Sequence, residues 1–144
     1  MPRRLVLALL FVVSPAAAED VACPDLAQAV QVGDCPSEAQ LKYSYAGYCS
    51  DDARMYDKDG GNTYVTLDAF KKLKNHALWE AGEFQGYLNC GRGQQETRAL
   101  KLVRLSVAPA GTLTRVVCGY EGGAMMVLRT RRACTQDGDV ARCD

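Results

Sequence analysis

The sequence predicts an α+β fold: a small disulfide-stapled domain with an antiparallel β-meander in the C-terminal third and one main helix at about residues 66–80. Three observations lead to this prediction. The chain begins with a secretory signal, so its cysteines belong in an oxidising compartment. Seven cysteines follow that signal. Turns rich in glycine and proline then separate three β-rich stretches.

Residues 1–18 have the composition of a secretory signal peptide. A basic start and an unbroken apolar run over residues 5–13 precede small residues at a cleavage site that ends at Ala18. The run is too short for a membrane-spanning helix. We therefore expect residues 19–144 to form one mature domain, in the periplasm or secreted.

Charge is unevenly distributed along the mature chain. Residues 19–90 carry 6 basic and 12 acidic side chains, and residues 91–144 carry 9 basic and 5 acidic ones. The near-neutral total argues against a nucleic-acid-binding protein or a bulk membrane binder. The asymmetry permits one basic face.

The first half of the domain suggests three elements. Residues 25–30 are compatible with a short helix. Residues 40–49 are predicted to form a strand, because apolar and polar side chains alternate from Leu41 to Tyr45. An acidic, turn-rich loop is expected over residues 51–61.

The main helix is predicted from Thr66, which suits an N-cap, with Asp68 in the first turn. Gly82 and Gly86 then indicate a loop or a short strand. One helical face is expected to hold Leu67, Phe70, Leu73, Ala77 and Leu78.

The C-terminal third predicts the meander. Strands are expected at residues 97–108, 112–120 and 124–132, joined by turns at residues 109–111 and 121–123. Short connections of this kind join neighbouring antiparallel strands.

The cysteines predict three disulfides and one unpaired thiol, which can join two chains into a dimer. Short loops make the pairs Cys23–Cys35 and Cys134–Cys143 sterically possible, but spacing does not fix the connectivity. With one histidine and no C-x-x-C motif, we expect no metal site and no cofactor. The cysteines are Cys23, Cys35, Cys49, Cys90, Cys118, Cys134 and Cys143.

Residues 57–70 resemble an EF-hand calcium loop that runs into its second helix. Gly61, Asn62 and Asp68 stand at loop positions 5, 6 and 12, where calcium sites use a ligand, a glycine and a glutamate. The ligand set fails, so an acidic turn before a capped helix is expected instead.

Catalytic candidates are few. His76 is expected on the surface of the main helix without a role, since no nucleophile-elbow motif accompanies it. Adjacent acids give the minimum equipment of a glycoside hydrolase. The acid pairs are Asp51–Asp52, Asp57–Asp59 and Glu80–Glu83. A small hydrolase that uses the acids of the loop at residues 51–59 is left as an alternative.

Aromatic and arginine side chains are the better binding candidates. Tyrosine favours interfaces because it buries a large area at a small entropy cost. Arginines on neighbouring meander strands can meet carboxylates or phosphates of a partner. The candidates are Tyr43, Tyr45, Tyr48, Tyr87, Arg104, Arg115, Arg129 and Arg131.

A strand ending in Cys118-Gly119-Tyr120, a glycine-rich turn, an apolar strand over residues 125–128 and a closing Cys134 form a recognisable run. This run resembles the end of several small secreted proteobacterial domain families of uncharacterised function. The resemblance implies a bacterial, periplasmic setting and carries no catalytic residue.

These features together predict a periplasmic binding module without enzymatic activity. An inhibitor or immunity protein against a cell-wall-degrading enzyme is the expected subtype, because a rigid disulfide scaffold loses little entropy on binding. The alternatives are a module that binds an envelope glycan and the small hydrolase named above. The expected partner is a protein or a glycan of the envelope.

Overall fold

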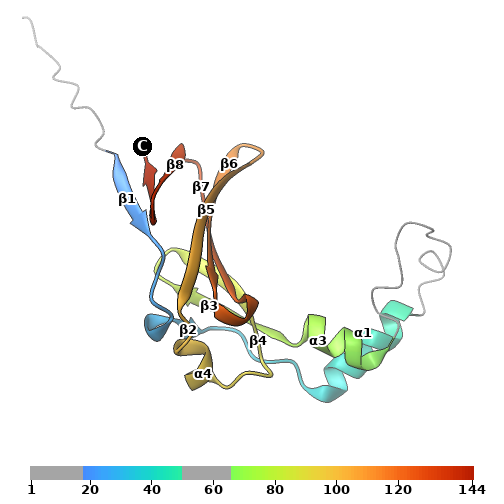
Figure 1. The fold of residues 1–144 in the computed structure, drawn as a ribbon. Helices are drawn as coiled ribbons and strands as arrows, with labels where there is room; N and C mark the ends of the chain where they lie inside the picture. Colours follow the sequence, from blue (N-terminus) through green and yellow to red (C-terminus); the bar gives the residue numbers. More distant parts are fainter. Residues whose placement is uncertain (1–17, 50–65) are drawn as a thin grey trace, which may run out of the picture.

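A computed structural model describes residues 18–49 and 66–144, with the backbone alone at residues 48 and 49. Two antiparallel sheets dominate it (Figure 1). The first has the strand order β1-β9-β8, and the second has the order β2-β3-β4-β7-β6-β5. The α+β class and the disulfide-stapled meander are therefore confirmed.

The strands and helices have the following bounds. The three-stranded sheet consists of β1 (Glu19–Ala22), β8 (Cys134–Asp137) and β9 (Val140–Cys143). The six-stranded sheet consists of β2 (Val30–Gln31), β3 (His76–Ala81), β4 (Phe84–Asn89), β5 (Leu102–Ala110), β6 (Leu113–Tyr120) and β7 (Met125–Thr130). The helices are α1 (Glu38–Cys49), α3 (Leu67–Lys74), α4 (Gln94–Arg98) and the short 3₁₀ turns η1 (Leu26–Gln28) and η2 (Glu121–Gly123).

The meander of β5, β6 and β7 lies where the sequence predicted it, with two corrections. Residues 94–98 form α4, so the first strand starts later than expected, at Leu102. The first turn also comes later, because Pro109 lies within β5, opposite Thr114. Because β5 is the edge of the sheet, the missing N–H of a proline is tolerated there. Gly111 makes the turn with φ +65°.

The predicted strand at residues 40–49 is wrong, because this segment belongs to helix α1. A capping box starts the helix. The Ser37 N–H donates to Gln40 Oε1 at 2.8 Å, and the Gln40 N–H donates to Ser37 Oγ at 3.2 Å. Two backbone donors at the helix start are thereby satisfied, which favours a helix over a strand.

The predicted main helix at residues 66–80 is correct in its first half only. Thr66 caps α3, since its Oγ1 accepts from the Ala69 N–H at 3.2 Å. The helix ends at Lys74, and residues 76–81 form β3 instead. Strand β3 pairs with β4 along its whole length, and Gly82 makes the turn between them at φ +59°.

The core lies on one face of the six-stranded sheet. Trp79, Leu88 and Met126 point into it from three neighbouring strands. Residues of η1 and of the three-stranded sheet, among them Leu26 and Ala141, cover these side chains. Figure 1 shows the three-stranded sheet at one end of the molecule, and α1 and α3 together at the other end.

Three disulfides tie these parts together. They are Cys23–Cys118, Cys35–Cys90 and Cys134–Cys143. The predicted number of bridges is confirmed. Of the two pairs that short loops make possible, Cys134–Cys143 forms and closes the β8–β9 hairpin. The other possible pair, Cys23–Cys35, does not form, because Cys23 bonds to Cys118 of β6 and Cys35 bonds to Cys90, just after β4. The side chain of Cys49 lies outside the described part of the chain.

Candidate functional site

The side chains of the six-stranded sheet that point away from the core form what we call the open sheet face. Its membership follows from the alternation of buried and exposed residues along each strand and from the pairing registers. The residues concerned are Val30 of β2, His76, Leu78 and Glu80 of β3, Gln85, Tyr87 and Asn89 of β4, Met125, Val127 and Arg129 of β7, Arg115, Val117 and Gly119 of β6, and Arg104, Ser106 and Ala108 of β5.

The centre of the open sheet face is apolar. Tyr87 lies opposite Leu78 on β3, and the register of β4 with β7 places Met125 on its other side. Tyr87 is 72 % exposed and Met125 is 51 % exposed. In the next row, Val127 lies opposite Val117. Large apolar side chains thus meet solvent across three adjacent strands.

Arg115 and Arg129 occupy one end of this face, and Arg104 lies about 13 Å away along the strands, in the row of Met125 and Gly119. Arg115 of β6 lies directly opposite Arg129 of β7. Arg104 of β5 lies opposite Gly119, and a Cβ added to that glycine would come within 3.2 Å of the Arg104 Cγ. Gly119 therefore leaves room for the arginine stem to lie flat on the sheet. Arg104, Arg115 and Arg129 thus share the open sheet face.

Tyr87, Arg104, Arg115 and Arg129 are therefore the four candidates that lie on this face, and of them only Arg115 and Arg129 are direct cross-strand neighbours. Arg131 is exposed just beyond the end of β7. Tyr43 and Tyr45 belong to helix α1 and not to the strand predicted at residues 40–49.

The tyrosines of α1 have separate surroundings. Tyr43 is 83 % exposed. The Tyr45 ring packs edge-on against Phe70 of α3, with 5.6 Å between ring centroids. Helix α1 is also joined to α3 through Glu38, whose carboxylate contacts Lys71 at 3.0 Å and Lys42 at 3.1 Å. Hydrogen bonds from Lys71 and Lys42 hold the pKa of Glu38 below its ordinary value. The side chain of Tyr48 lies outside the described part of the chain.

A groove of about 640 Å³ adjoins the open sheet face. Asp34, Tyr43, Ser44 and His76 are among its lining residues, and the Cys35–Cys90 disulfide borders it. His76 belongs to β3 and not to a helix, so its predicted position is wrong. Within the described residues, the His76 ring has no hydrogen-bond partner, whereas a nucleophile–base pair needs such a bond.

Other candidate chemistry falls mostly outside the described part. The acid pairs Asp51–Asp52 and Asp57–Asp59 lie there, and so does most of the calcium-like segment. Glu80 accepts a hydrogen bond from Gln85 at 2.9 Å. Within residues 18–49 and 66–144, no group of three or more histidine, cysteine or acidic side chains is arranged to hold a metal ion.

Tyr120 shows what a core tyrosine of this protein looks like. It is 4 % exposed, and its hydroxyl donates to the Pro24 carbonyl oxygen at 2.5 Å. Burial, with a smaller contribution from the charge of Asp25, raises the pKa of Tyr120 to about 12. Tyr87 differs from Tyr120, since its side chain is 72 % exposed to solvent.

Over the described residues, no helix is both long and apolar enough to cross a membrane. Comparison of the chain with models of protein families, with curated proteins and with solved structures finds no match. The resemblance to small secreted proteobacterial domains therefore stays a prediction, and the candidate site is judged on its geometry alone.

Proposed function

We propose that this protein is a periplasmic binding module without enzymatic activity, and that it binds a protein partner through the open sheet face. One observation carries the proposal: Tyr87, Met125 and three arginines lie on a single exposed face of one sheet. The three disulfides fit the oxidising compartment that this proposal requires.

The composition of this face is that of a protein interface. Tyrosine, methionine and arginine are enriched at such interfaces, whereas lysine, glutamate and aspartate are depleted. The open sheet face has one tyrosine, one methionine, three arginines, no lysine and one acid, Glu80. Scattered exposed apolar residues are normal on protein surfaces, but a contiguous set on neighbouring strands indicates an interaction site.

The size of the face sets the kind of interface. Six strands spaced about 4.8 Å apart, each about six residues long, span on the order of 500 Å². A standard interface covers about 800 Å² on each partner. A partner of this face must therefore gain most of its affinity from a few anchors. Tyr87 is the best placed, because exposed aromatic residues near the centre of an interface dominate binding.

An inhibitor of a cell-wall-degrading enzyme is the subtype that the face supports. Glycosidases carry a pair of carboxylates across the cleft where they cut. The arginine end of the open sheet face has the complementary charge, and the apolar centre suits the cleft walls. The disulfides limit the conformational entropy that the module loses on binding.

The test is inhibition of peptidoglycan hydrolysis by a panel of purified muramidases, amidases and endopeptidases. We expect one class to be inhibited, and we expect Tyr87→Ala to weaken that inhibition about thirty-fold, as loss of an anchor worth about 2 kcal/mol does. Tyr43→Ala is the matched control, since it removes an equally exposed tyrosine outside the face. Equal effects of the two substitutions would contradict the proposed face, and no inhibition of any class would contradict the inhibitor subtype.

The groove beside Tyr43 favours a second candidate function, the binding of an envelope glycan. Its volume is within the range of small-ligand sites, and tyrosine rings stack on sugars. Titration with soluble peptidoglycan fragments distinguishes the two functions. Binding that is lost in Tyr43→Ala and kept in Tyr87→Ala would favour the glycan, and the reverse pattern with an enzyme would favour the protein partner.

A further inference from the structure

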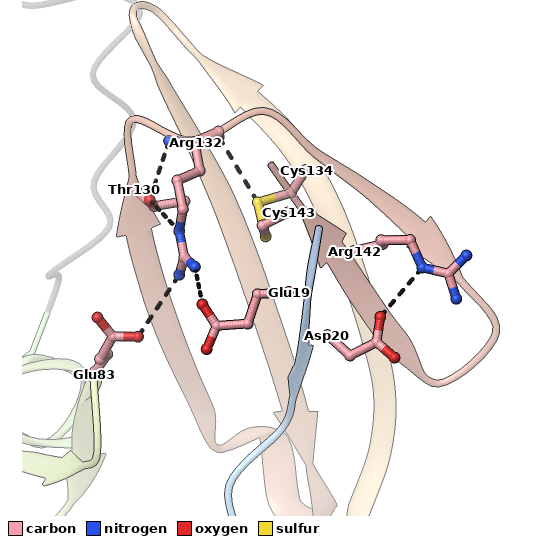
Figure 2. Close-up of a disulfide and its surroundings, with 8 residues drawn as sticks. All are labelled: Glu19, Asp20, Glu83, Thr130, Arg132, Cys134, Arg142 and Cys143. Carbon is pink, nitrogen blue, oxygen red and sulfur yellow. Dashed lines mark hydrogen bonds and ion pairs between the residues drawn. A yellow bond between two sulfur atoms is a disulfide. The ribbon is translucent and has the colours of Figure 1, made fainter. Parts of the chain in front are cut away.

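Arginines of the three-stranded sheet and its surroundings are neutralised by acids. Arg132 contacts Glu19 and Glu83, and Arg142 contacts Asp20 and Asp137. Figure 2 shows the first two contacts and the Arg142–Asp20 contact around the Cys134–Cys143 disulfide. The hydrogen bond to Asp20, with the charge of Asp137, raises the pKa of Arg142. Each guanidinium here thus has two carboxylates near it.

The arginines of the open sheet face differ from these. Among the described residues, Arg104, Arg115 and Arg129 have no ion pair. The acid of the face is Glu80, which lies two strands and one row away from Arg129, about 12 Å. Glu83, in the turn before β4, is nearer to that end of the sheet, and it contacts Arg132. Glu80 is already bound by Gln85. The positive charge at this end therefore stays uncompensated within the described structure.

The pairing of Arg115 with Arg129 lowers the stability of the free protein. Like charges directly opposite each other on antiparallel strands are destabilising. An acid at either position would give a favourable cross-strand pair instead. An arrangement that lowers the stability of the free protein is expected where a partner supplies the missing charge.

We propose that Arg115 and Arg129 form a recognition site for an acidic protein surface that presents neighbouring aspartate or glutamate carboxylates, with Arg104 as a separate positive charge further along the same face. This inference rests on the proposed function and names the chemistry of the partner. A guanidinium binds a carboxylate through two parallel N–H···O bonds, so two neighbouring arginines select two neighbouring acids by geometry as well as by charge. The exposed Tyr87 and Met125 supply the apolar contact beside this site.

The first experiment measures how much the Arg115–Arg129 pair lowers the stability of the free protein. In Arg129→Glu, an ion pair with Arg115 replaces the like-charged pair, and we expect the melting temperature to rise by about 2 °C. Arg129→Gln removes the repulsion without creating an ion pair, so it should give a smaller rise. A fall in melting temperature in both variants would overturn the claim that this pair is uncompensated.

The second experiment measures recognition with a defined probe. A peptide of eight glutamates is titrated into the disulfide-intact protein, and binding is followed by chemical-shift changes of the backbone amides. We expect the changes to centre on the strands that carry Arg115 and Arg129, with affinity falling as salt is added. Arg129→Glu should weaken binding at least five-fold. Lys72→Ala, which removes an exposed charge from α3, is the control and should leave binding unchanged.

Each other outcome contradicts the inference. Shift changes centred on α3 or on Arg142 would place the acidic site elsewhere. Tighter binding of inorganic phosphate than of the peptide at equal ionic strength would indicate a phosphate site. Self-association that is lost in Arg129→Glu would make a second copy of this chain the partner. The proposed function fails independently, through the enzyme panel, which does not use this peptide.

Discussion

The disulfides give a prediction of stability that depends on loop length. In the chain-entropy description, a bridge stabilises the folded state by restricting the unfolded chain, and the effect grows with the length of the loop that it closes. Cys23–Cys118 spans 95 residues and Cys134–Cys143 spans 9. Because Cys35–Cys90 is nested inside the longer span, the loop that Cys23–Cys118 closes when the other bridges are intact shortens to about 40 residues.

Removal of Cys23–Cys118 should therefore cost about 3.9 kcal/mol, and removal of Cys134–Cys143 about 2.6 kcal/mol. The two pairs are matched in burial, since Cys118 and Cys143 are fully buried and their partners are half-buried. Double cysteine-to-alanine variants thus remove similar packing. The difference of about 1.3 kcal/mol isolates the effect of loop length.

The assay is urea unfolding of the two double variants without reductant, with free energies from linear extrapolation. The variant without Cys23–Cys118 should be the less stable of the two. A larger loss of stability on removal of Cys134–Cys143 than on removal of Cys23–Cys118 would refute the reasoning. It would show that Cys134–Cys143 acts through the folded hairpin and not through the unfolded chain.

Three further predictions concern single side chains. Tyr120→Ala should lower the stability by about 3–5 kcal/mol, as truncation of other buried aromatic residues does, whereas Tyr87→Ala should lower it by less than about 0.5 kcal/mol. Equal losses in thermal unfolding would contradict the assignment of Tyr87 to the surface. The raised pKa of Tyr120 means that the folded state holds its proton more tightly than the unfolded state, so stability should be full below pH 10 and decline as the pH rises from 10.0 to about 12. Melting temperatures measured over this pH range should fall. In Tyr120→Phe, the part of the fall that comes from ionisation of Tyr120 should be absent. Thr66→Ala should destabilise the protein by about 1 kcal/mol through the lost cap of α3, and urea unfolding with an unchanged midpoint would contradict this role.

The regular parts of the fold could be predicted from local sequence. The strands β6 and β7 have β-branched and apolar residues between glycine turns, and Thr66 is a recognisable cap. The failures have local explanations too. At residues 40–49, side-chain alternation suggested a strand, but the pair Ser37 and Gln40 is the S-x-x-Q signature of a capping box.

The prediction was wrong for the second half of the main helix because the apolar residues there fit both the helical period and the alternation of a strand. Phe70, Leu73 and Ala77 have helical spacing, but Ala77, Trp79 and Ala81 alternate as a strand that is buried on one side. The alternation wins because β4 lies within reach across Gly82 and pairs with every residue of β3. Sequence alone did not show that this partner strand was there.

The candidate site could be predicted in its residue types but not in its assembly. Tyr87 and the meander arginines were identified as binding candidates, and they share a face only through the registers of β4 with β7 and of β6 with its two neighbours. Met125 was missed, because a methionine in an apolar strand gives no sign of exposure. A one-residue shift in register would have moved every one of these side chains into the core.

The pairing of β1 with β9 has a consequence for how the protein matures. Residues 19–22 form their sheet with residues 140–143, so two segments about 120 residues apart in the sequence pair with each other. A chain that is threaded through a translocation channel cannot complete this sheet until its far end has emerged. Contacts between such distant segments also form slowly. If the protein is the periplasmic module proposed above, the order in which its thiols are oxidised decides whether Cys23 bonds to Cys118 or to the much nearer Cys35.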